Sequence, residues 1–222
     1  MGFSAVIDST PFEAIKNRLQ PGQHLLAVSK LQSIQKITQL YHLGQEHFGE
    51  NYIQEALEKI EKLKDLSIQW HLIGPIQKNK IKFLKNHFSY IHSVDSVELA
   101  QKISEKSLAI GHCQKVFIQV NISDEDSKSG FSVVDLNAAF PELKKLSGLK
   151  IVGLMTIPPL ENEAEKNRIY FKKLKELGQK FNLVEFSMGT SHDYQVALEE
   201  GATWIRLGTI LFGERQLKHS NP

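Results

Sequence analysis

One lysine near the start of the chain stands where its side chain could act as a nucleophile. Lys30 follows directly on residues 25–29 (LLAVS), a mainly apolar run that predicts a buried strand. A lysine that is partly desolvated at the end of such a strand is less basic than a free lysine, whose pKa is about 10.4, and its neutral amine can attack an aldehyde. The alternative is a lysine that ends a strand and points into water, and position alone favours this alternative.

Two segments near the other end of the chain have the composition of an anion-binding site. Residues 187–191 (SMGTS) combine glycine with hydroxyl side chains, and Gly208 is followed by Thr209. Small residues let backbone N–H groups approach an anion, hydroxyl groups add donors, and a helix N-terminus adds a favourable dipole. Ser191 is expected to cap the helix that follows it. Either segment alone could be a tight turn that uses glycine, whereas the two together favour a phosphate.

The elements that must position these residues are strands, which short runs of apolar, β-branched or aromatic residues predict. The second run (HFG) is weak in composition and is inferred from the regular spacing of the others. The eight runs are residues 24–29, 47–49, 68–73, 90–94, 115–120, 149–156, 183–187 and 204–207.

The segments between these runs have apolar residues at helical spacing. Ser33 is predicted to cap the helix after the first strand, and Gly44 to end it. Asp95 together with Glu98 resembles a capping box in front of another helix. A further helix is expected over residues 10–19, before the first strand.

Strand and helix alternate about eight times, and the strands are apolar on both faces, as a parallel sheet covered by helices requires. This repeat predicts an α/β fold, a closed (β/α)₈ TIM barrel, in one domain that spans residues 1–222. The alternative is an open, doubly wound sheet, which needs fewer strands. No proline-rich linker, block of charge or low-complexity tract divides the chain.

Composition excludes several classes of protein. The 222 residues carry 27 basic and 25 acidic side chains, a formal net charge of +2, which argues against nucleic acid or an anionic membrane as the main partner. The single cysteine, Cys113, and an N-terminus without a signal-peptide pattern favour the cytoplasm. The nine histidines and Cys113 show no metal-binding spacing, so no metal site is predicted.

A barrel would bring the lysine and the two glycine-containing segments to one end of the molecule. Function in such barrels collects at the C-terminal ends of the strands, and the loops after the seventh and eighth strands are the usual phosphate site. Lys30 ends the first predicted strand, and the two segments end the seventh and eighth. A lysine that can react with an aldehyde and faces a phosphate site suggests pyridoxal 5′-phosphate (PLP) as the ligand.

Nine ordered motifs also resemble those of a known family, the PLP homeostasis proteins or YggS/PROSC group, which is similar in fold to the N-terminal barrel of alanine racemase. The resemblance covers residues 25–215, nearly the whole chain, and implies a fold-type III PLP protein. The motifs are AVSK at residues 27–30, FGENY at 48–52, WHLIG at 70–74, QKNK at 77–80, HSVDS at 92–96, SKSG at 127–130, GLMTIP at 153–158, SMG at 187–189 and FGER at 212–215.

The resemblance also implies roles for individual residues. PLP would be held as a Schiff base on Lys30, with Arg206 near the pyridine nitrogen. The phosphate would lie among Ser191, Gly208 and Thr209, and two further residues, Asn51 and His71, would line the pocket.

Some of these positions have alternatives or depart from the family pattern. Asn51 could instead be a helix cap, and His71 a core histidine with satisfied ring nitrogens. Pro75 stands where the family usually has histidine, and Thr190 stands where methionine is common. Neither departure involves the lysine, so we expect the cofactor to bind and only local contacts to differ.

The same residues bear on whether the protein is an enzyme. An arginine at the pyridine nitrogen does not protonate it, which weakens the ring as an electron sink. The chain ends seven residues after Arg215, so we expect no second domain to supply the tyrosine base that alanine racemases use. We therefore expect no catalytic residues.

A PLP-binding homeostasis protein that buffers or delivers the cofactor is the favoured interpretation. It would be a monomer whose partners are PLP and PLP-dependent apoenzymes. The alternatives are a single-domain amino-acid racemase and a barrel that binds a different phosphorylated ligand without PLP.

Overall fold

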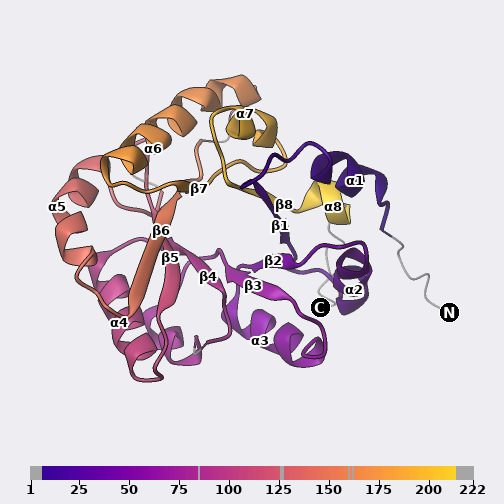
Figure 1. Cartoon of the computed structure of the whole chain (residues 1–222), viewed down its shortest axis with the longest axis horizontal. Helices are drawn as coiled ribbons and strands as arrows, with labels where there is room; N and C mark the ends of the chain where they lie inside the picture. The colour runs from indigo at the N-terminus through magenta and orange to yellow at the C-terminus, as the bar shows by residue number, and fades with distance from the viewer. Residues whose placement is uncertain (1–6, 85, 126–127, 160, 162, 214–222) are drawn as a thin grey trace, which may run out of the picture.

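The eight apolar runs form eight parallel strands that close into a barrel, as the sequence predicts (Figure 1). The computed structural model describes residues 7–84, 86–125, 128–159, 161 and 163–213. The strands are β1 (His24–Val28), β2 (His47–Glu50), β3 (Gln69–Leu72), β4 (Tyr90–Val94), β5 (Gln114–Gln119), β6 (Leu149–Met155), β7 (Glu185–Ser187) and β8 (Trp204–Leu207).

Helices surround this ring of strands (Figure 1). They are α1 (Thr10–Lys16), α2 (Ile34–His42), α3 (Ile53–Lys62), α4 (Val97–Leu108), α5 (Val133–Leu143), α6 (Arg168–Lys180), α7 (Tyr194–Glu199) and α8 (Thr209–Phe212). Two short 3₁₀ helices, η1 (Lys78–Phe83) and η2 (Ala164–Asn167), precede β4 and α6. None of the helices that the structure describes has the length and apolar character that a membrane crossing requires.

The predicted helix caps are right in one case and wrong in others. The Ser33 side chain accepts a hydrogen bond from the backbone of Lys36 at the start of α2, as predicted. The cap of α4 is Ser96, whose hydroxyl accepts from Leu99 N–H, and not Asp95. The helix after β7 begins two residues later than predicted, so its cap position is Asp193 and not Ser191. Tyr52, and not Asn51, occupies the cap position of α3.

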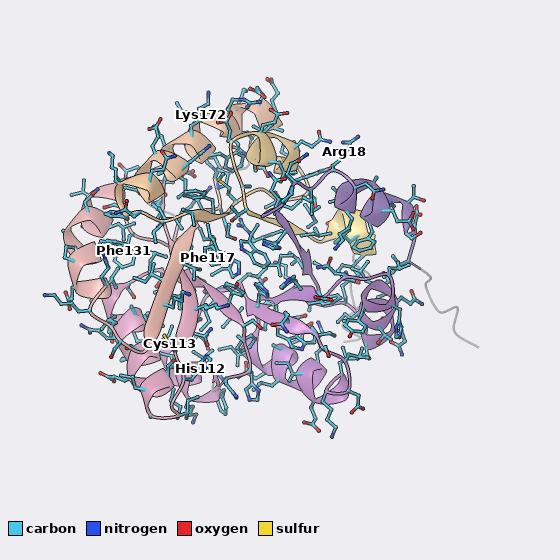
Figure 2. The ribbon with its side chains drawn as sticks, viewed as in Figure 1. Arg18, His112, Cys113, Phe117, Phe131 and Lys172 are labelled. Atoms are coloured by element: carbon cyan, nitrogen blue, oxygen red, sulfur yellow. The ribbon has the colours of Figure 1, made fainter. Side chains whose placement is uncertain are left out.

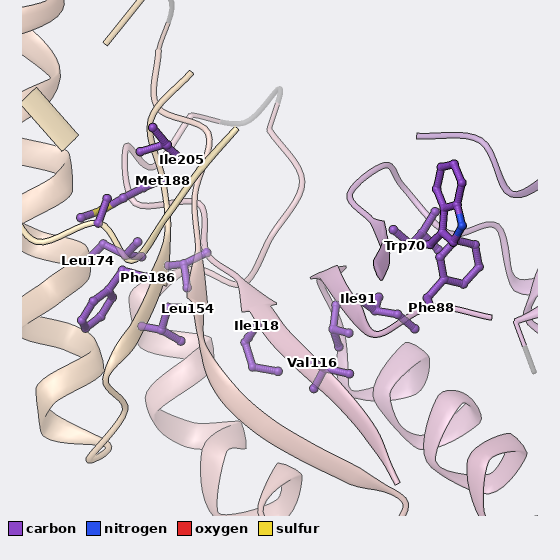
Figure 3. Packing of buried hydrophobic residues seen from close by; sticks show 14 of the residues in the cluster. Trp70, Phe88, Ile91, Val116, Ile118, Leu154, Leu174, Phe186, Met188 and Ile205 are labelled. Carbon is purple, nitrogen blue, oxygen red and sulfur yellow. The ribbon is translucent and has the colours of Figure 1, made fainter. Parts of the chain in front are cut away.

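Side chains alternate between two layers along each strand. One layer packs against the helices, and Figure 3 shows part of it, with Leu174 of α6 beside Leu154 and Phe186 of the sheet. The other layer fills the barrel and includes Leu26 and Phe117, the latter labelled in Figure 2. Because alternate residues face the same way, Leu26 and Val28 share the inner face of β1.

Closure of the barrel places the first and last strands side by side. Strand β8 pairs with β1, with Arg206 opposite Leu26 and Leu207 opposite Ala27. A Cβ atom added to Gly208 would lie 3.4 Å from the carbonyl oxygen of Val28. The β8–α8 loop therefore lies against the end of β1, two residues before Lys30.

Candidate functional site

Lys30 lies in a tight turn at the end of β1. The turn spans residues 29–32 and is closed by a hydrogen bond of 3.0 Å from Gln32 N–H to the carbonyl oxygen of Ser29. Lys30 is half-buried, whereas the next residue, Leu31, is 64% exposed. The backbone of Leu31 has φ +61°, a conformation that favours glycine or asparagine over leucine. The nucleophile candidate thus stands in a short, strained connection.

Arg206 of β8 is buried inside the barrel and held at both ends of its guanidinium group. Its Nη1 atom donates to Ser187 Oγ and its Nη2 atom to the carbonyl oxygen of Thr156, each across 2.8 Å. Burial lowers the pKa of Arg206 to about 10, and the charge of Asp193 acts in the opposite direction. The group therefore remains positively charged at neutral pH, in a fixed orientation.

Three histidines extend the contacts of Arg206 across the barrel interior. Ser187 Oγ lies 2.8 Å from Nδ1 of His92, and Nε2 of His92 lies 2.9 Å from Nδ1 of His71. Nε2 of His71 in turn lies 3.1 Å from Nδ1 of His47. Burial holds the pKa values of His71 and His92 well below the ordinary range, so both rings are neutral at pH 7.

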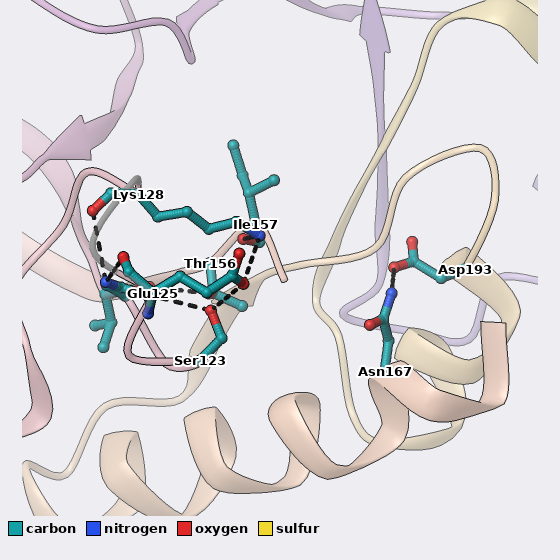
Figure 4. A network of polar contacts seen from close by, with 9 residues as sticks. Ser123, Glu125, Lys128, Thr156, Ile157, Asn167 and Asp193 are labelled. Carbon is teal, nitrogen blue, oxygen red and sulfur yellow. Dashed lines mark hydrogen bonds and ion pairs between the residues drawn. The ribbon is translucent and has the colours of Figure 1, made fainter. Parts of the chain in front are cut away.

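The two glycine-containing segments directly follow β7 and β8. Gly189, after β7, has φ +89°, and a Cβ atom there would lie 2.6 Å from Cβ of Ala197, so glycine is required. The buried carboxylate of Asp193 fixes the same loop, since it accepts from the backbone and hydroxyl of Thr190 at 2.7 and 3.1 Å and from Asn167 at 2.7 Å (Figure 4). Ser191 and Gly208 are half-buried, and Thr209 is exposed.

A cavity of about 300 Å³ opens at the mouth of the barrel. Its lining residues are Asn51, Ile73, Gly74, Pro75, Gln119, Val120, Asn121, Lys128, Ser129 and Ile157, which follow or end β2, β3, β5 and β6. A Cβ atom at Gly74 would lie 2.2 Å from the carbonyl oxygen of Asn51, so glycine lets these two loops meet. The Oδ1 atom of Asn51 is buried and has no hydrogen-bond partner among the described residues.

Two residues of the SKSG motif, Lys128 and Ser129, also line this cavity. Lys128 donates to the carbonyl oxygen of Ile157 across 3.3 Å and forms an ion pair with Glu125 at 3.3 Å (Figure 4). Asn121 binds the backbone carbonyl of Glu125 at 2.8 Å. Lys128 thus contacts residues after both β5 and β6, while Ser127 lies outside the described residues.

The structure brings some of the predicted site residues together and separates others. Arg206 and Gly208 lie beside Leu26 and Val28 of β1, and Lys30 follows two residues after Val28. Thr209 begins α8, and Ser191 lies in the loop after β7. Asn51 lines the cavity across the mouth, together with Pro75. Both ring nitrogens of His71 are engaged by other histidines, which supports the alternative of a core histidine.

Sequence reasoning missed the residues that hold Arg206. Ser187, His92 and Thr156 were treated as parts of motifs, yet all three are fully buried and linked to Arg206 directly or through one partner. The available signal was a set of polar residues at alternate positions of apolar strands, because such residues must face the barrel interior and find partners there.

The chemistry of these groups fits PLP. A half-buried lysine could join an aldehyde, and Arg206 offers a fixed cation inside the barrel. Gly208 lies against Val28 of β1, and Thr209 follows it as the first residue of α8. The unpartnered Oδ1 atom of Asn51 is a free acceptor at the mouth.

Comparison with known proteins is consistent with this fit. A family model described as the alanine racemase N-terminal domain matches residues 11–216. A pyridoxal phosphate homeostasis protein of Aquifex aeolicus is 42% identical over 198 residues, which cover 86% of this chain and 87% of the relative. A protein of the same name from Pseudomonas aeruginosa is 45% identical over 193 residues, covering 86% of this chain and 84% of the relative.

Solved structures share the same barrel. The structure of PipY from Synechococcus elongatus with PLP bound has a TM-score of 0.87 and 37% identity, and the match covers 92% of this chain and 99% of PipY. An alanine racemase of Clostridium difficile has a TM-score of 0.78 at 15% identity, and the match covers 98% of this chain and 61% of the racemase. The likeness to the racemase is one of fold alone.

Proposed function

The chain belongs to the family of pyridoxal phosphate homeostasis proteins, and from that premise we propose that it binds PLP through Lys30 and takes part in intracellular PLP homeostasis. The observation that carries the proposal is the junction of β1 and β8. Arg206 pairs with Leu26 and Gly208 lies against Val28 there, and Lys30 follows Val28 by two residues, which supports a shared site for residues that are distant in sequence. The relationship to PipY, whose structure contains PLP, supports the same ligand.

Each residue at this junction has a chemical task in the proposal. Lys30 carries PLP as a Schiff base, whose formation joins the lysine nitrogen to the aldehyde carbon and releases the aldehyde oxygen with two protons as water. Arg206 donates a hydrogen bond to the pyridine nitrogen. Ser191, Gly208 and Thr209 bind the phosphate.

The remaining predicted residues act around the cofactor. Asn51 contacts it from the cavity side of the mouth, where its Oδ1 atom has no partner among the described residues. His71 acts indirectly, because its two ring nitrogens are bound to His47 and His92 and its influence reaches Arg206 through His92 and Ser187.

A visible spectrum before and after borohydride tests the lysine assignment. Purified protein mixed with PLP should develop a Schiff-base absorption band, and reduction should leave a pyridoxyl group that peptide mapping places on Lys30. Lys30→Ala should lose the band and the adduct, whereas Lys64→Ala, at an exposed lysine paired with Glu61, should keep both. An adduct on Lys78, Lys80 or Lys128 in the unaltered protein would show that the assignment is wrong.

The finer parts of the function follow from the same site. The relatives are named as homeostasis proteins, and we propose a monomeric, cytoplasmic carrier that buffers PLP and passes it to apoenzymes without turning over amino acids. Activation of a PLP-dependent apoenzyme by the loaded protein, faster than by the PLP it releases into solution, tests delivery. Equal rates would leave buffering as the only role.

A further inference from the structure

Behind the turn that carries Lys30 lies a cluster of three charged side chains, which we call the Lys59 cluster: Glu50, Glu55 and Lys59. Glu50 ends β2, and the other two residues come from α3, one turn apart. The Nζ atom of Lys59 lies 2.7 Å from Oε1 of Glu50 and 2.7 Å from Oε1 of Glu55. The cluster lies on the helix side of the sheet, and neither the cavity nor the phosphate loops include it.

The Lys59 cluster binds the backbone on both sides of Lys30. Before the lysine, the carbonyl oxygen of Ser29 accepts a hydrogen bond from Lys59 Nζ at 2.7 Å. After it, the N–H group of Leu31 donates to Oε1 of Glu55 at 2.6 Å. The two contacts are joined, because Lys59 and Glu55 also pair with each other. The peptide groups that flank Lys30 are thus held by one ion pair.

A third contact fixes the residue before the lysine. The hydroxyl of Ser29 donates to Oε1 of Glu50 at 2.5 Å, and the Ser29 N–H donates to the carbonyl oxygen of Gly49 at 2.9 Å. All the polar groups of Ser29 are therefore engaged by the cluster, by β2 or by the turn itself. The connection from β1 to Lys30 has little freedom left.

The burial of the cluster argues against a purely stabilising purpose. Glu50 is fully buried, and the side chains of Lys59 and Glu55 are 7% and 22% exposed. Removing such charges from water offsets much of their mutual attraction, so a buried ion pair is weak evidence for stability. Desolvation raises the pKa of Glu50, while the charge and hydrogen bond of Lys59 lower it. The Lys59 cluster instead holds the backbone groups that it binds in a defined geometry.

The conformation of Leu31 shows which geometry the cluster holds. A leucine at φ +61° is strained, and such strain persists only where the surroundings impose it. The side chain of Leu31 is largely exposed, so its own packing does not impose the conformation. The hydrogen bonds to Glu55 and within the turn remain as the restraints.

We propose that Lys59 and Glu55 are positioning residues for Lys30, which fix the two peptide groups on either side of it so that its amine meets the aldehyde of PLP at the barrel mouth. The proposal rests on the proposed function, because it assumes that Lys30 is the residue that carries PLP. It assigns the two residues no contact with the cofactor itself.

The test separates formation of the Schiff base from binding of the phosphorylated ring. Lys59→Met removes the ammonium group but keeps most of the side-chain volume, and Lys64→Met is the exposed control. The first measurement is the rate at which the Schiff-base band forms after PLP is added, from pH 6 to pH 9. The second is the affinity for pyridoxine 5′-phosphate, which has the ring and the phosphate but no aldehyde.

We expect Lys59→Met to form the Schiff base at least about tenfold more slowly at every pH, because a misplacement of about 1 Å can reduce a rate about a hundredfold. Its affinity for pyridoxine 5′-phosphate should stay within about twofold of that of the unaltered protein. Equal loss of both properties would assign Lys59 a merely structural role. A shifted pH profile with an unchanged maximum rate would show an effect of charge on Lys30 and would also overturn the proposal.

Two substitutions of Glu55 keep the test valid if Lys59→Met does not fold. Glu55→Ala removes the acceptor for Leu31 N–H, whereas Glu55→Gln keeps an oxygen at that place. Glu55→Ala should slow Schiff-base formation, and Glu55→Gln should restore part of the rate; rates equal to that of the unaltered protein in both variants would refute the proposal. If the unaltered protein itself traps no pyridoxyl group on Lys30, it is the proposed function that fails.

Discussion

Arg206 donates from Nη1 to Oγ of Ser187, and the same oxygen lies 2.8 Å from Nδ1 of His92. An arginine can only donate, so the serine oxygen accepts and its own proton is free to go to Nδ1 of His92. A neutral His92 then carries its proton on Nε2 and donates to His71, which donates in turn to His47. With the Ser187 proton directed at His92, the tautomers of His92 and His71 follow from one another along this chain of hydrogen bonds.

This arrangement makes the stability of the protein depend on pH. Burial lowers the pKa of His47 to about 4 and the pKa values of His71 and His92 well below 6.5, so below pH 6.5 the unfolded chain binds more protons than the folded one. The free energy of unfolding therefore decreases as the pH is lowered, by at most about 1.4 kcal/mol per pH unit for each histidine. The raised pKa of Glu50 acts in the opposite direction. We expect the three histidines to outweigh Glu50, so that the protein is less stable at pH 5 than at pH 6.

Urea unfolding at pH 5, 6, 7 and 8 measures this dependence. His47→Gln should reduce the slope between pH 6 and pH 5 by about 1.4 kcal/mol per pH unit, because one titrating group is removed. The interval from pH 7 to pH 8 is an internal control, since histidine is largely neutral there in both states. A slope that His47→Gln leaves unchanged would show that other groups cause the pH dependence.

The strained turn beside Lys30 gives a second prediction. A non-glycine residue in the left-handed region costs about 1 to 2 kcal/mol of stability, which a glycine at that position would recover. Glycine also has more freedom in the unfolded chain, and this lowers stability by about 0.5 to 1 kcal/mol. Leu31→Gly should therefore raise the free energy of unfolding by about 0.5 to 1 kcal/mol, as measured by chemical denaturation.

Leu43→Gly is the matched control for the turn. Leu43 is also an exposed leucine, but its φ is −80°, so glycine relieves no strain there and should lower stability. If both substitutions destabilise the protein equally, the positive φ of Leu31 carries no strain.

The fold could be predicted from the sequence because its signals are local and repeat eight times. Even the weak run at β2 is a strand, since the rhythm of its neighbours requires one there. The caps of α4 and α7 were placed wrongly because adjacent polar residues compete for the same role, and only the path of the backbone decides between Asp95 and Ser96.

The contacts around the candidate site could not be predicted in the same way. In sequence, Lys59 is one charge on an amphipathic helix, and its burial becomes apparent only when α3 packs against the ends of β1 and β2. His71, His92 and Ser187 come from three strands, and nothing local indicates that barrel closure aligns them with Arg206. Long-range pairing of this kind depends on the tertiary fold.

The proposed phosphate site gives a third prediction. Thr209→Ala removes one hydroxyl donor from the phosphate, and a hydrogen bond to a charged group is typically worth about 1.5 to 3 kcal/mol. The affinity for PLP should fall about ten- to a hundredfold, whereas the affinity for pyridoxal, which has no phosphate, should hardly change. A titration monitored by absorbance measures the affinity for each ligand. Equal losses for the two ligands would mean that Thr209 acts on the fold or the ring.

The last prediction concerns turnover of amino acids. The pKa of Arg206 is about 10, so its guanidinium group is charged at neutral pH. At the pyridine nitrogen, where we propose that it lies, it would not protonate the ring and would leave it a weak electron sink. Among the described residues that line the cavity, Lys128 alone has a titratable side chain, and it is engaged by Glu125 and Ile157. A positioned base contributes about 10²- to 10⁴-fold to a rate. Deuterium incorporation at Cα of L- and D-amino acids should therefore be far slower than ordinary turnover, and exchange at about 1 to 10³ per second for any amino acid would establish a racemase instead of a carrier.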